Sequence, residues 1–206
     1  MHTQPRPAGA ILAGGAARRL GGAAKGLLEI DGERVIDRVA RAMQPYTSQL
    51  MIVASTPAAR EWITGVDGVA DEHPGGGAVA AIATALRAAR TDVLVVAWDM
   101  PFVSGAVIAP LLADAGEHDA VMWQLSSGLE PLCALYRASA LPTLDAAIAG
   151  GARRARDVAS LLRLRVLPYE PVAGEPSPFL SINTPADLAL ARRFAGVDTP
   201  PPADRD

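Results

Sequence analysis

Short apolar segments alternate along this chain with longer stretches of helical spacing, and this alternation constrains the fold more than any other feature. The short segments are rich in β-branched residues and too short for typical helices, so we expect them to form buried strands. They cover residues 9–13, 50–54, 93–97, 120–123, 132–136 and 164–167.

The stretches between these segments have apolar residues at helical spacing. They cover residues 35–43, 78–90, 107–115 and 141–149. Nearly continuous apolar strands need cover on both faces, so the alternation predicts an α/β fold of three layers (αβα), with a mostly parallel, Rossmann-like sheet between the helices. Ligands bind such a sheet beyond the C-terminal ends of its strands.

Length and composition indicate one domain. The chain has 206 residues, half of them hydrophobic, which is enough to bury one substantial core. A last helix is expected over residues 185–194, with Thr184 as its N-cap and Pro185 at its first position. We therefore expect a single domain over residues 1–197 and a disordered tail, rich in Pro and Asp, over residues 198–206.

Composition and charge argue against several classes of protein. No run approaches the roughly 18 apolar residues of a membrane span, and residues 1–7 lack the apolar core of a signal peptide, so we expect no membrane partner and a cytoplasmic location. A net charge of −3 with mixed signs gives no broad basic surface for nucleic acid. The lone Cys133 excludes an intramolecular disulfide, and we expect it to be buried in a strand, with Trp98 and Trp123 also in the core.

A glycine-rich loop with two cations follows the first expected strand. Residues 12–25 read Leu-Ala-Gly-Gly-Ala-Ala-Arg-Arg-Leu-Gly-Gly-Ala-Ala-Lys. Glycines let backbone N–H groups approach a phosphate closely, and Arg19 and Lys25 can neutralise its charge. The loop has neither the Gly-Lys-Ser/Thr of a Walker loop nor the dinucleotide pattern Gly-x-Gly-x-x-Gly at its usual spacing. We interpret it as a phosphate-binding loop, the alternative being a plain strand-to-helix turn.

Several motifs occur in the same order as in one family of enzymes. They are Leu12-Ala13-Gly14-Gly15, Arg19-Leu20-Gly21-Gly22, Lys25-Gly26-Leu27-Leu28, Asp71-Glu72-His73-Pro74, Asp99-Met100-Pro101-Phe102, Glu130-Pro131-Leu132, Gly151-Ala152-Arg153-Arg154 and Asn183-Thr184-Pro185-Ala186-Asp187. Together they resemble nucleotidyltransferases that activate sugars or cofactors, and most closely the molybdenum cofactor guanylyltransferases. The resemblance implies a nucleotide-diphospho-sugar transferase-like fold. It also implies transfer of GMP from GTP to molybdopterin-bound molybdenum cofactor, forming the guanine dinucleotide cofactor and pyrophosphate.

The resemblance also assigns residues to the two substrates. The residues expected to contact GTP are Leu12, Ala13, Gly14, Gly15, Lys25, Ala54, Asp71 and Asp99. The molybdopterin-type acceptor is expected near Arg153, Arg154 and Asn183. Proteins of the same cofactor pathway are expected partners, because a large and oxygen-sensitive acceptor needs direct handover.

The implied chemistry requires charge neutralisation more than proton transfer, because the acceptor phosphate is already a nucleophile at neutral pH. We therefore expect Lys25, Arg19 and Asp99 to be catalytic and do not expect His73 to act as a general base. Asp99 closely follows the strand over residues 93–97, where a carboxylate suits Mg²⁺, the expected cofactor and metal. Both Lys25 and Asp99 are expected in surface loops.

The weaker candidates have structural alternatives. Asp71 begins a Gly-rich loop; the resemblance implies that it lies near the ribose or base, and the alternative is a loop carboxylate that faces water. Arg153 and Arg154 follow two glycines and either hold the acceptor phosphate or begin a solvated basic helix. Asn183 either contacts substrate or metal or caps the last helix.

Two departures from the family pattern affect nucleotide and acceptor choice. The loop after Asp71 continues Gly77-Ala78-Val79-Ala80-Ala81 where Gly-Pro-Leu-Ala-Gly is usual, and Ala24 precedes Lys25 where Asp is frequent. The second Gly of Leu-Ala-Gly-Gly favours the guanylyl branch, because the cytidylyl branch resembles it with Leu-Ala-Ala-Gly.

Other functions remain open from the sequence. The nearest are a cytidylyltransferase of the same cofactor and a sugar-phosphate nucleotidyltransferase. An NAD-dependent oxidoreductase shares the architecture but needs an acidic residue at the end of the second strand, where this chain has Ser55-Thr56. A non-catalytic module would bind nucleotide without transferring it, and the presence of both Lys25 and Asp99 argues against that function.

Overall fold

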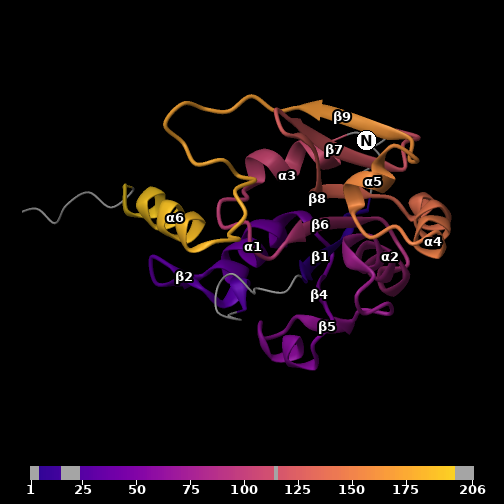
Figure 1. Cartoon of the computed structure of the whole chain (residues 1–206), viewed down its shortest axis with the longest axis horizontal. Helices are drawn as coiled ribbons and strands as arrows, with labels where there is room; N and C mark the ends of the chain where they lie inside the picture. The colour runs from indigo at the N-terminus through magenta and orange to yellow at the C-terminus, as the bar shows by residue number, and fades with distance from the viewer. Residues whose placement is uncertain (1–4, 15–23, 114–115, 198–206) are drawn as a thin grey trace, which may run out of the picture.

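The computed structural model of the chain describes residues 5–14, 24–113 and 116–197, and a seven-stranded sheet lies at its centre (Figure 1). The strands are β1 (Ala8–Ala13), β4 (Leu50–Ala54), β5 (Asp67–Ala70), β6 (Val93–Ala97), β7 (Ala120–Leu125), β8 (Gly128–Tyr136) and β9 (Leu164–Pro168). Their order across the sheet is β5-β4-β1-β6-β8-β7-β9. Neighbouring strands are parallel except at β8, which is antiparallel to β6 and β7. The prediction of a mostly parallel sheet is confirmed.

Strand β1 is apolar throughout and pairs on both sides. Ile11 lies opposite Ile52 of β4 and Val96 of β6, and all three side chains are fully buried. Successive residues of a strand point to opposite faces, so the next residue, Leu12, is buried in the hydrophobic cluster on the other face. Both faces of the central sheet therefore need helices.

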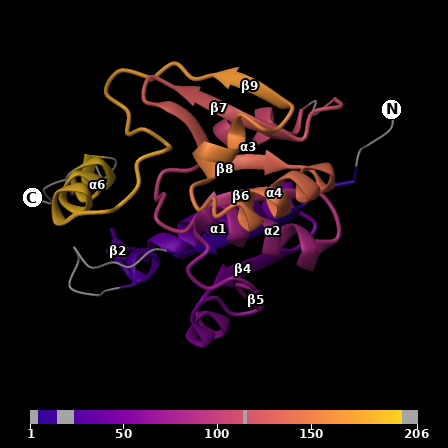
Figure 2. The ribbon, with the colours of Figure 1, turned by 45° about the vertical axis from the view of Figure 1, so that its right-hand side comes forward.

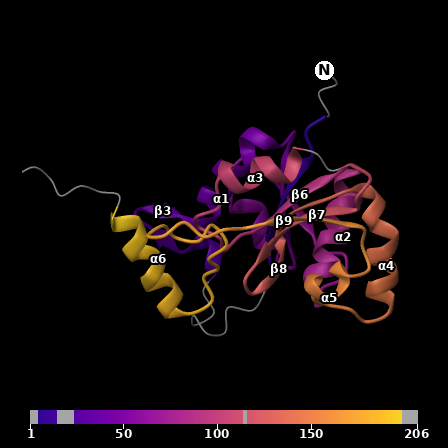
Figure 3. The same ribbon diagram turned by 90° about the horizontal axis from the view of Figure 1, so that it is seen from above.

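Helices cover both faces and produce the expected three layers (Figure 3). One face packs against α1 (Val35–Met43) and α3 (Gly105–Leu112), and the other against α2 (Gly77–Ala89), α4 (Leu141–Ala149) and α5 (Ala155–Ala159). On α1, Ile36, Val39 and Met43 recur at intervals of three or four residues and are fully buried, which is the apolar stripe of an amphipathic helix.

The remaining elements lie at the periphery. They are α6 (Pro185–Val197), the hairpin strands β2 (Glu29–Ile30) and β3 (Glu33–Arg34), and the 3₁₀ helices η2 (Lys25–Leu27), η3 (Gln44–Tyr46), η4 (Pro57–Glu61) and η5 (Ala138–Ala140). The hairpin turn, Asp31-Gly32, has φ angles of 51° and 72°, as a two-residue hairpin turn requires. Helix α6 lies beside this hairpin (Figures 1 and 2), where Ile30, Ile182 and Ala191 are fully buried together.

The structure differs from the sequence prediction mainly at element ends. Strand β5 was not expected, because its Asp67-Gly68 start breaks any apolar run, whereas the helix expected after Arg154 is present as the short α5. Helix α3 ends at Leu112, before residue 115, and α6 continues past residue 194 to Val197. The tail over residues 198–206 lies outside the described residues. Within the described part of the chain, no helix is long and apolar enough to span a bilayer.

Cys133 and Trp123 lie in the core, as expected. Cys133 is fully buried, and burial raises the pKa of its thiol far above the ordinary value. Trp123 is 8% exposed, and its Nε1 donates a hydrogen bond of 3.0 Å to the carbonyl oxygen of Val107. Burial in the core therefore accounts for both residues.

Candidate active site

A cleft of about 470 Å³ opens at the C-terminal ends of β1, β4 and β6. This is the end at which an open parallel sheet binds its ligands. The cleft brings together most of the residues that the sequence assigned to the nucleotide, namely Leu12, Ala13, Gly14, Ala54, Asp71 and Asp99. Gly15 and Arg19 lie outside the described residues.

Lys25 contacts two other polar side chains, one of which, Asp99, lines the cleft. Its Nζ lies 3.5 Å from Oδ2 of Asp99 and donates a hydrogen bond of 2.5 Å to Oδ1 of Asn183. Lys25 and Asp99 are each 8% exposed, so the expectation that both lie in surface loops is wrong. Burial of either charge alone would be unfavourable, and it is tolerated here because the two charges face each other and Asn183 accepts a further ammonium hydrogen.

Contacts between neighbouring residues hold Lys25 at this depth. Gly26 packs on Trp98 so closely that a Cβ on the glycine would lie 2.6 Å from Cε3 of the ring. Trp98 itself stacks on Trp62, with ring centroids 5.0 Å apart. Trp98 is 5% exposed, as expected of a core residue, although it also borders the cleft. Because Gly26 follows Lys25 and Trp98 precedes Asp99, their contact brings the two charged side chains together.

A capping box at the start of α6 orients Asn183. The N–H of Asp187 donates to Oγ1 of Thr184 over 3.2 Å, and the carboxylate of Asp187 accepts hydrogen bonds from the N–H groups of Thr184 (2.7 Å) and Asn183 (2.9 Å). Thr184 is therefore the N-cap, as predicted. The alternative that the Asn183 side chain caps this helix is wrong, because its amide oxygen accepts from Lys25.

Two carboxyl groups on neighbouring parts of the sheet, Asp99 after β6 and Glu130 on β8, both have pKa values shifted by burial. Burial raises the pKa of Asp99, while the charge and hydrogen bond of Lys25 act in the opposite direction. Burial likewise raises the pKa of Glu130 on β8. The N–H of Leu132 and the charge of Arg156 oppose that rise, and the negative charge of Asp99 adds to it. Glu130 belongs to the motif Glu130-Pro131-Leu132, for which no role was predicted. Among the described residues, no group of three or more His, Cys, Asp or Glu side chains could hold a metal ion.

Asp71 lies beyond β5, two strands away from β1 in the sheet, and borders the same cleft as Asp99. Its N–H donates to the carbonyl oxygen of Ala54 over 3.1 Å. Its Oδ1 accepts a hydrogen bond of 3.0 Å from the N–H of His73 and lies 3.5 Å from Oγ1 of Thr84. These bonds fix the start of the loop that leads into α2.

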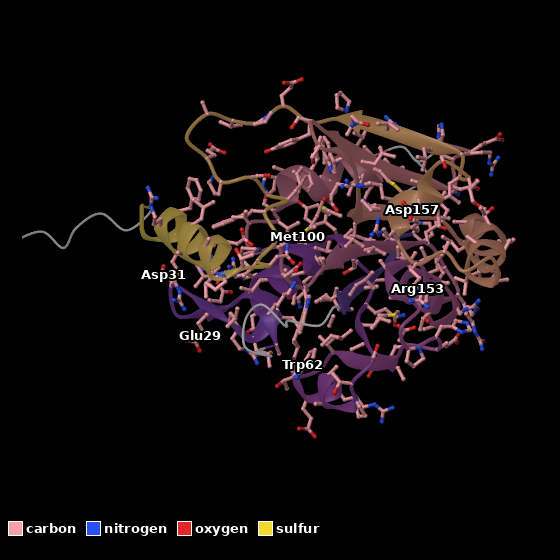
Figure 4. All side chains as sticks on the ribbon, viewed as in Figure 1. Glu29, Asp31, Trp62, Met100, Arg153 and Asp157 are labelled. Atoms are coloured by element: carbon pink, nitrogen blue, oxygen red, sulfur yellow. The ribbon has the colours of Figure 1, made fainter. Side chains whose placement is uncertain are left out.

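Arg153 and Arg154 lie apart from the Lys25 group. Both are exposed and precede α5. Arg153 borders a second, more open cleft of about 570 Å³ between residues 72–76 and the end of α4. Figure 4 shows Arg153 on the side of α2 and Trp62 near β5. In the described part of the chain, the lining of the 470 Å³ cleft includes neither arginine.

A mostly parallel sheet, with a glycine-rich sequence after its central strand and a buried Lys-Asp pair at its strand ends, is the arrangement expected of a nucleotidyltransferase. The sequence profile of the MobA-like NTP transferase domain matches residues 9–166. A probable molybdenum cofactor guanylyltransferase of Chloroflexus aggregans is 34% identical over 204 residues, which cover 92% of this chain and 95% of that protein. The chain belongs to the molybdenum cofactor guanylyltransferases, a family built on the MobA-like NTP transferase domain.

Further similarities support this membership. A molybdenum cofactor guanylyltransferase of Cereibacter sphaeroides is 34% identical over 194 residues, covering 92% of this chain and 97% of that protein. The crystal structure of molybdopterin-guanine dinucleotide biosynthesis protein A from Archaeoglobus fulgidus matches with a TM-score of 0.78 at 29% identity, covering 92% of this chain and 99% of that one. A 2-C-methyl-D-erythritol 4-phosphate cytidylyltransferase from Thermus thermophilus, at 21% identity and a TM-score of 0.67, covers 94% of this chain and 100% of that one, and shares the fold.

Proposed function

We propose that the protein transfers GMP from GTP to the terminal phosphate of molybdopterin-bound molybdenum cofactor and releases pyrophosphate. The observation that carries this proposal is the buried polar group of Lys25, Asp99 and Asn183 beside the cleft at the strand ends. The names of the relatives supply the nucleotide and the acceptor. The buried ammonium group of Lys25, next to the cleft-lining Asp99, supports binding of a triphosphate in this cleft.

The reaction needs little proton chemistry. An oxygen of the acceptor phosphate attacks the α-phosphorus of GTP, a new P–O bond forms, and the bond from that phosphorus to the oxygen bridging to the β-phosphate breaks. The attacking oxygen is ionised at neutral pH, so alignment and charge neutralisation dominate catalysis. Lys25 is held between Asp99 and Asn183 and supplies a preorganised positive charge. Arg19, outside the described residues, is proposed to supply a second one.

Mg²⁺ is the proposed cofactor, and the oxygen atoms around Lys25 fit it. Oδ2 of Asp99 and Oδ1 of Asn183 converge on one cationic nitrogen, at 3.5 and 2.5 Å. Magnesium prefers oxygen ligands and usually shares one or two carboxylates with substrate phosphates. We propose Asp99 as the carboxylate that would hold the metal, with the amide oxygen of Asn183 next to it. The metal would supply further neutralisation of the triphosphate charge.

The remaining assignments follow the shape of the two clefts. Leu12, Ala13, Gly14 and Ala54 line the 470 Å³ cleft and are proposed to contact the nucleotide, and Asp71, in the same lining, is proposed to contact its nucleoside part. The exposed Arg153 and Arg154 are proposed for the acceptor. A cytoplasmic location and handover from other enzymes of the pathway complete the proposal.

Nucleotide selectivity tests the proposal directly. Purified protein is titrated with Mg²⁺ and GTP, CTP, ATP or NAD while its thermal unfolding is followed, because a ligand that binds the folded state raises Tm as its concentration exceeds Kd. We expect the largest increase with GTP. A preference for CTP would move the chain to the cytidylyl branch, and a response to NAD alone would overturn the proposal.

Transfer is then tested under anaerobic conditions by measuring pyrophosphate release from GTP with and without the pterin acceptor. Release that depends on the acceptor and is lost in Asp99→Asn is the expected result. GTP binding without acceptor-dependent release would indicate a non-catalytic binding module.

A further inference from the structure

Thr84 is a buried polar residue in a helix that is otherwise apolar on its inner side. It is 1% exposed and has Ala83 and Ala85, both fully buried, as neighbours on α2. Its Oγ1 accepts a hydrogen bond of 3.3 Å from the N–H of Glu72 and donates one of 3.5 Å to Oδ1 of Asp71. A buried hydroxyl is unfavourable unless it forms hydrogen bonds, and both bonds of Thr84 go to the loop that borders the cleft.

These bonds restrict the carboxylate of Asp71. Its Oδ1 accepts from the N–H of His73 over 3.0 Å as well as from Thr84. Its backbone N–H is bonded to Ala54 at the end of β4. Within the described ranges, no donor is recorded for Oδ2 of Asp71, and Asp71 borders the 470 Å³ cleft. One carboxylate oxygen is therefore held by the protein, and the other is available to a ligand.

We propose that Thr84 is a positioning residue for nucleoside recognition. By holding Oδ1 of Asp71 from the buried side, it directs Oδ2 toward hydrogen-bond donors of the bound nucleoside. A carboxylate accepts from N–H groups of a guanine base and from ribose hydroxyls alike, and the test separates these two sources. The inference rests on the proposed function and concerns the nucleoside end of its site, away from Lys25 and the phosphates.

The test compares three nucleotides in the wild type, Thr84→Val and Thr84→Ser. GTP is the reference, inosine triphosphate lacks the 2-amino group of the base, and 2′-deoxy-GTP lacks one ribose hydroxyl. We expect the wild type to bind GTP more tightly than at least one of the two analogues. Thr84→Val should reduce this preference by about tenfold, because that is the effect of losing one hydrogen bond to a charged group. Thr84→Ser keeps the hydroxyl and is therefore expected to keep the nucleotide preference of the wild type. If Thr84→Val loses preference for GTP over inosine triphosphate, Asp71 contacts the base. If it loses preference for GTP over 2′-deoxy-GTP, Asp71 contacts the ribose.

Thr47→Val provides a matched control. Thr47 is also buried, at 6% exposed, and its hydroxyl donates to the carbonyl oxygen of Met43 over 3.2 Å, at the C-terminal end of α1. We expect Thr47→Val to keep the nucleotide preference of the wild type even if its Tm falls. In the transfer assay, Thr84→Val should raise KM for GTP while kcat stays near the wild-type value, because the phosphate end of the site is unchanged.

Three outcomes would overturn the inference. In the first, Thr84→Val keeps the wild-type ratios of affinity between GTP and both analogues. In the second, Thr84→Val loses affinity for all three nucleotides equally. In the third, the wild type itself binds all three nucleotides with equal affinity. Failure of the proposed function is distinguishable, because then the wild type would not bind GTP at all. A wild type that binds and discriminates GTP, with unchanged ratios in Thr84→Val, would remove only the role of Thr84.

Discussion

Lys25 donates a hydrogen bond to Asn183 although the two residues are 158 positions apart in the chain. The connection is reinforced next to it, because the N–H of Ile182 donates to the carbonyl oxygen of Asp99 over 3.0 Å. The segment before α6 is thus attached to Asp99, just after β6, and to Lys25 at the start of η2. Asn183 lies beyond residue 166, where the match to the NTP transferase domain ends, yet it belongs to the same polar group as Lys25.

Removing the side chain of Asn183 should reduce turnover without abolishing the fold. In Asn183→Ala, Lys25 loses the acceptor that fixes its ammonium group, and we expect kcat to fall by about 10- to 100-fold, since a slight displacement of a catalytic charge has effects of this size. Steady-state kinetics with GTP and the acceptor measure the change.

The adjacent Thr184→Ala is the control for this variant. It removes the N-cap of α6 and should cost about 1 kcal/mol of stability, with a much smaller effect on kcat, since Lys25 keeps its acceptor. Equal loss of kcat in both variants would show that the helix start as a whole, and not the Asn183 side chain, supports catalysis.

Replacing Lys25 should make stability depend on pH. The charge of Lys25 opposes the rise in the pKa of Asp99 that burial causes, so Lys25→Met should raise that pKa further. A carboxyl group whose pKa is higher in the folded than in the unfolded state destabilises the fold once it ionises. We therefore expect the Tm of Lys25→Met to lie well below that of the wild type at pH 8 and to approach it at pH 5, with turnover lowered by orders of magnitude.

The double variant Lys25→Met/Asp99→Asn tests the cause of this pH dependence. With no carboxyl group left to ionise, its difference in Tm from the wild type should vary much less between pH 5 and 8. If the double variant kept the full pH dependence of Lys25→Met, the ionisation of Asp99 would not be the source.

A second carboxylate, Asp119 before β7, should stabilise the fold except in acid. It accepts hydrogen bonds from the side chain and N–H of Arg163 and from the hydroxyl of Ser139. The bonds from Arg163 hold its pKa far below the usual range, with help from Ser139 and against the effect of burial. Such a group stabilises the folded state above the unfolded pKa, about 4, and loses this effect as the pH falls below it.

Asp119→Asn should therefore lower Tm at pH 7, by roughly 2–4 °C for each kcal/mol lost in a chain of this size. The difference from the wild type should shrink as the pH is lowered from 5 toward 2. Asp37→Asn is the control, because the bond of Asp37 to Arg34 joins partly exposed side chains three residues apart, and such pairs contribute little. If the difference in Tm between Asp119→Asn and the wild type stayed constant with pH, ionised Asp119 would not be the source of the stabilisation.

Gly77 and Gly75 offer a matched pair of substitutions. Both have positive φ angles, 73° and 85°, so alanine at either position is strained by about 1 kcal/mol. A Cβ on Gly77 would also collide with the carbonyl oxygen of Arg153, whereas one on Gly75 would meet no atom within 4 Å. We expect Gly77→Ala to lower the free energy of unfolding clearly more than Gly75→Ala, as urea titration would show. An equal decrease in the free energy of unfolding in both variants would mean that the loop before α5 moves to accommodate the added methyl group.

The central strands could be predicted from sequence almost to the residue. The prediction for residues 50–54 and 93–97 matches β4 and β6, because short, continuous apolar runs indicate burial on both faces of a sheet. Strand β5 could not be predicted, since an edge strand is half exposed and its Asp67-Gly68 start resembles a turn. Its existence depends on pairing with β4.

The sequence predicted which residues belong to the candidate site, but not their burial or their contacts with one another. The motifs identified Lys25 and Asp99, yet their burial depends on the contact between Gly26 and Trp98, which no local pattern reveals. Thr84 was missed altogether. The available signal was a lone hydroxyl on the Ala-rich helix α2, since a buried threonine among alanines needs a hydrogen-bond partner.

The position of Asn183 has a consequence for synthesis of the protein on the ribosome. The chain emerges from its N-terminus, and domains begin to fold as they emerge. All seven strands of the main sheet end by Pro168, so the hydrophobic core can form on a nascent chain that still lacks its acceptor for Lys25. The hydrogen bond between Lys25 and Asn183 can then form only after the strands of the sheet have been synthesised. A released chain that ends at residue 182 would contain all seven strands and yet lack the acceptor for Lys25.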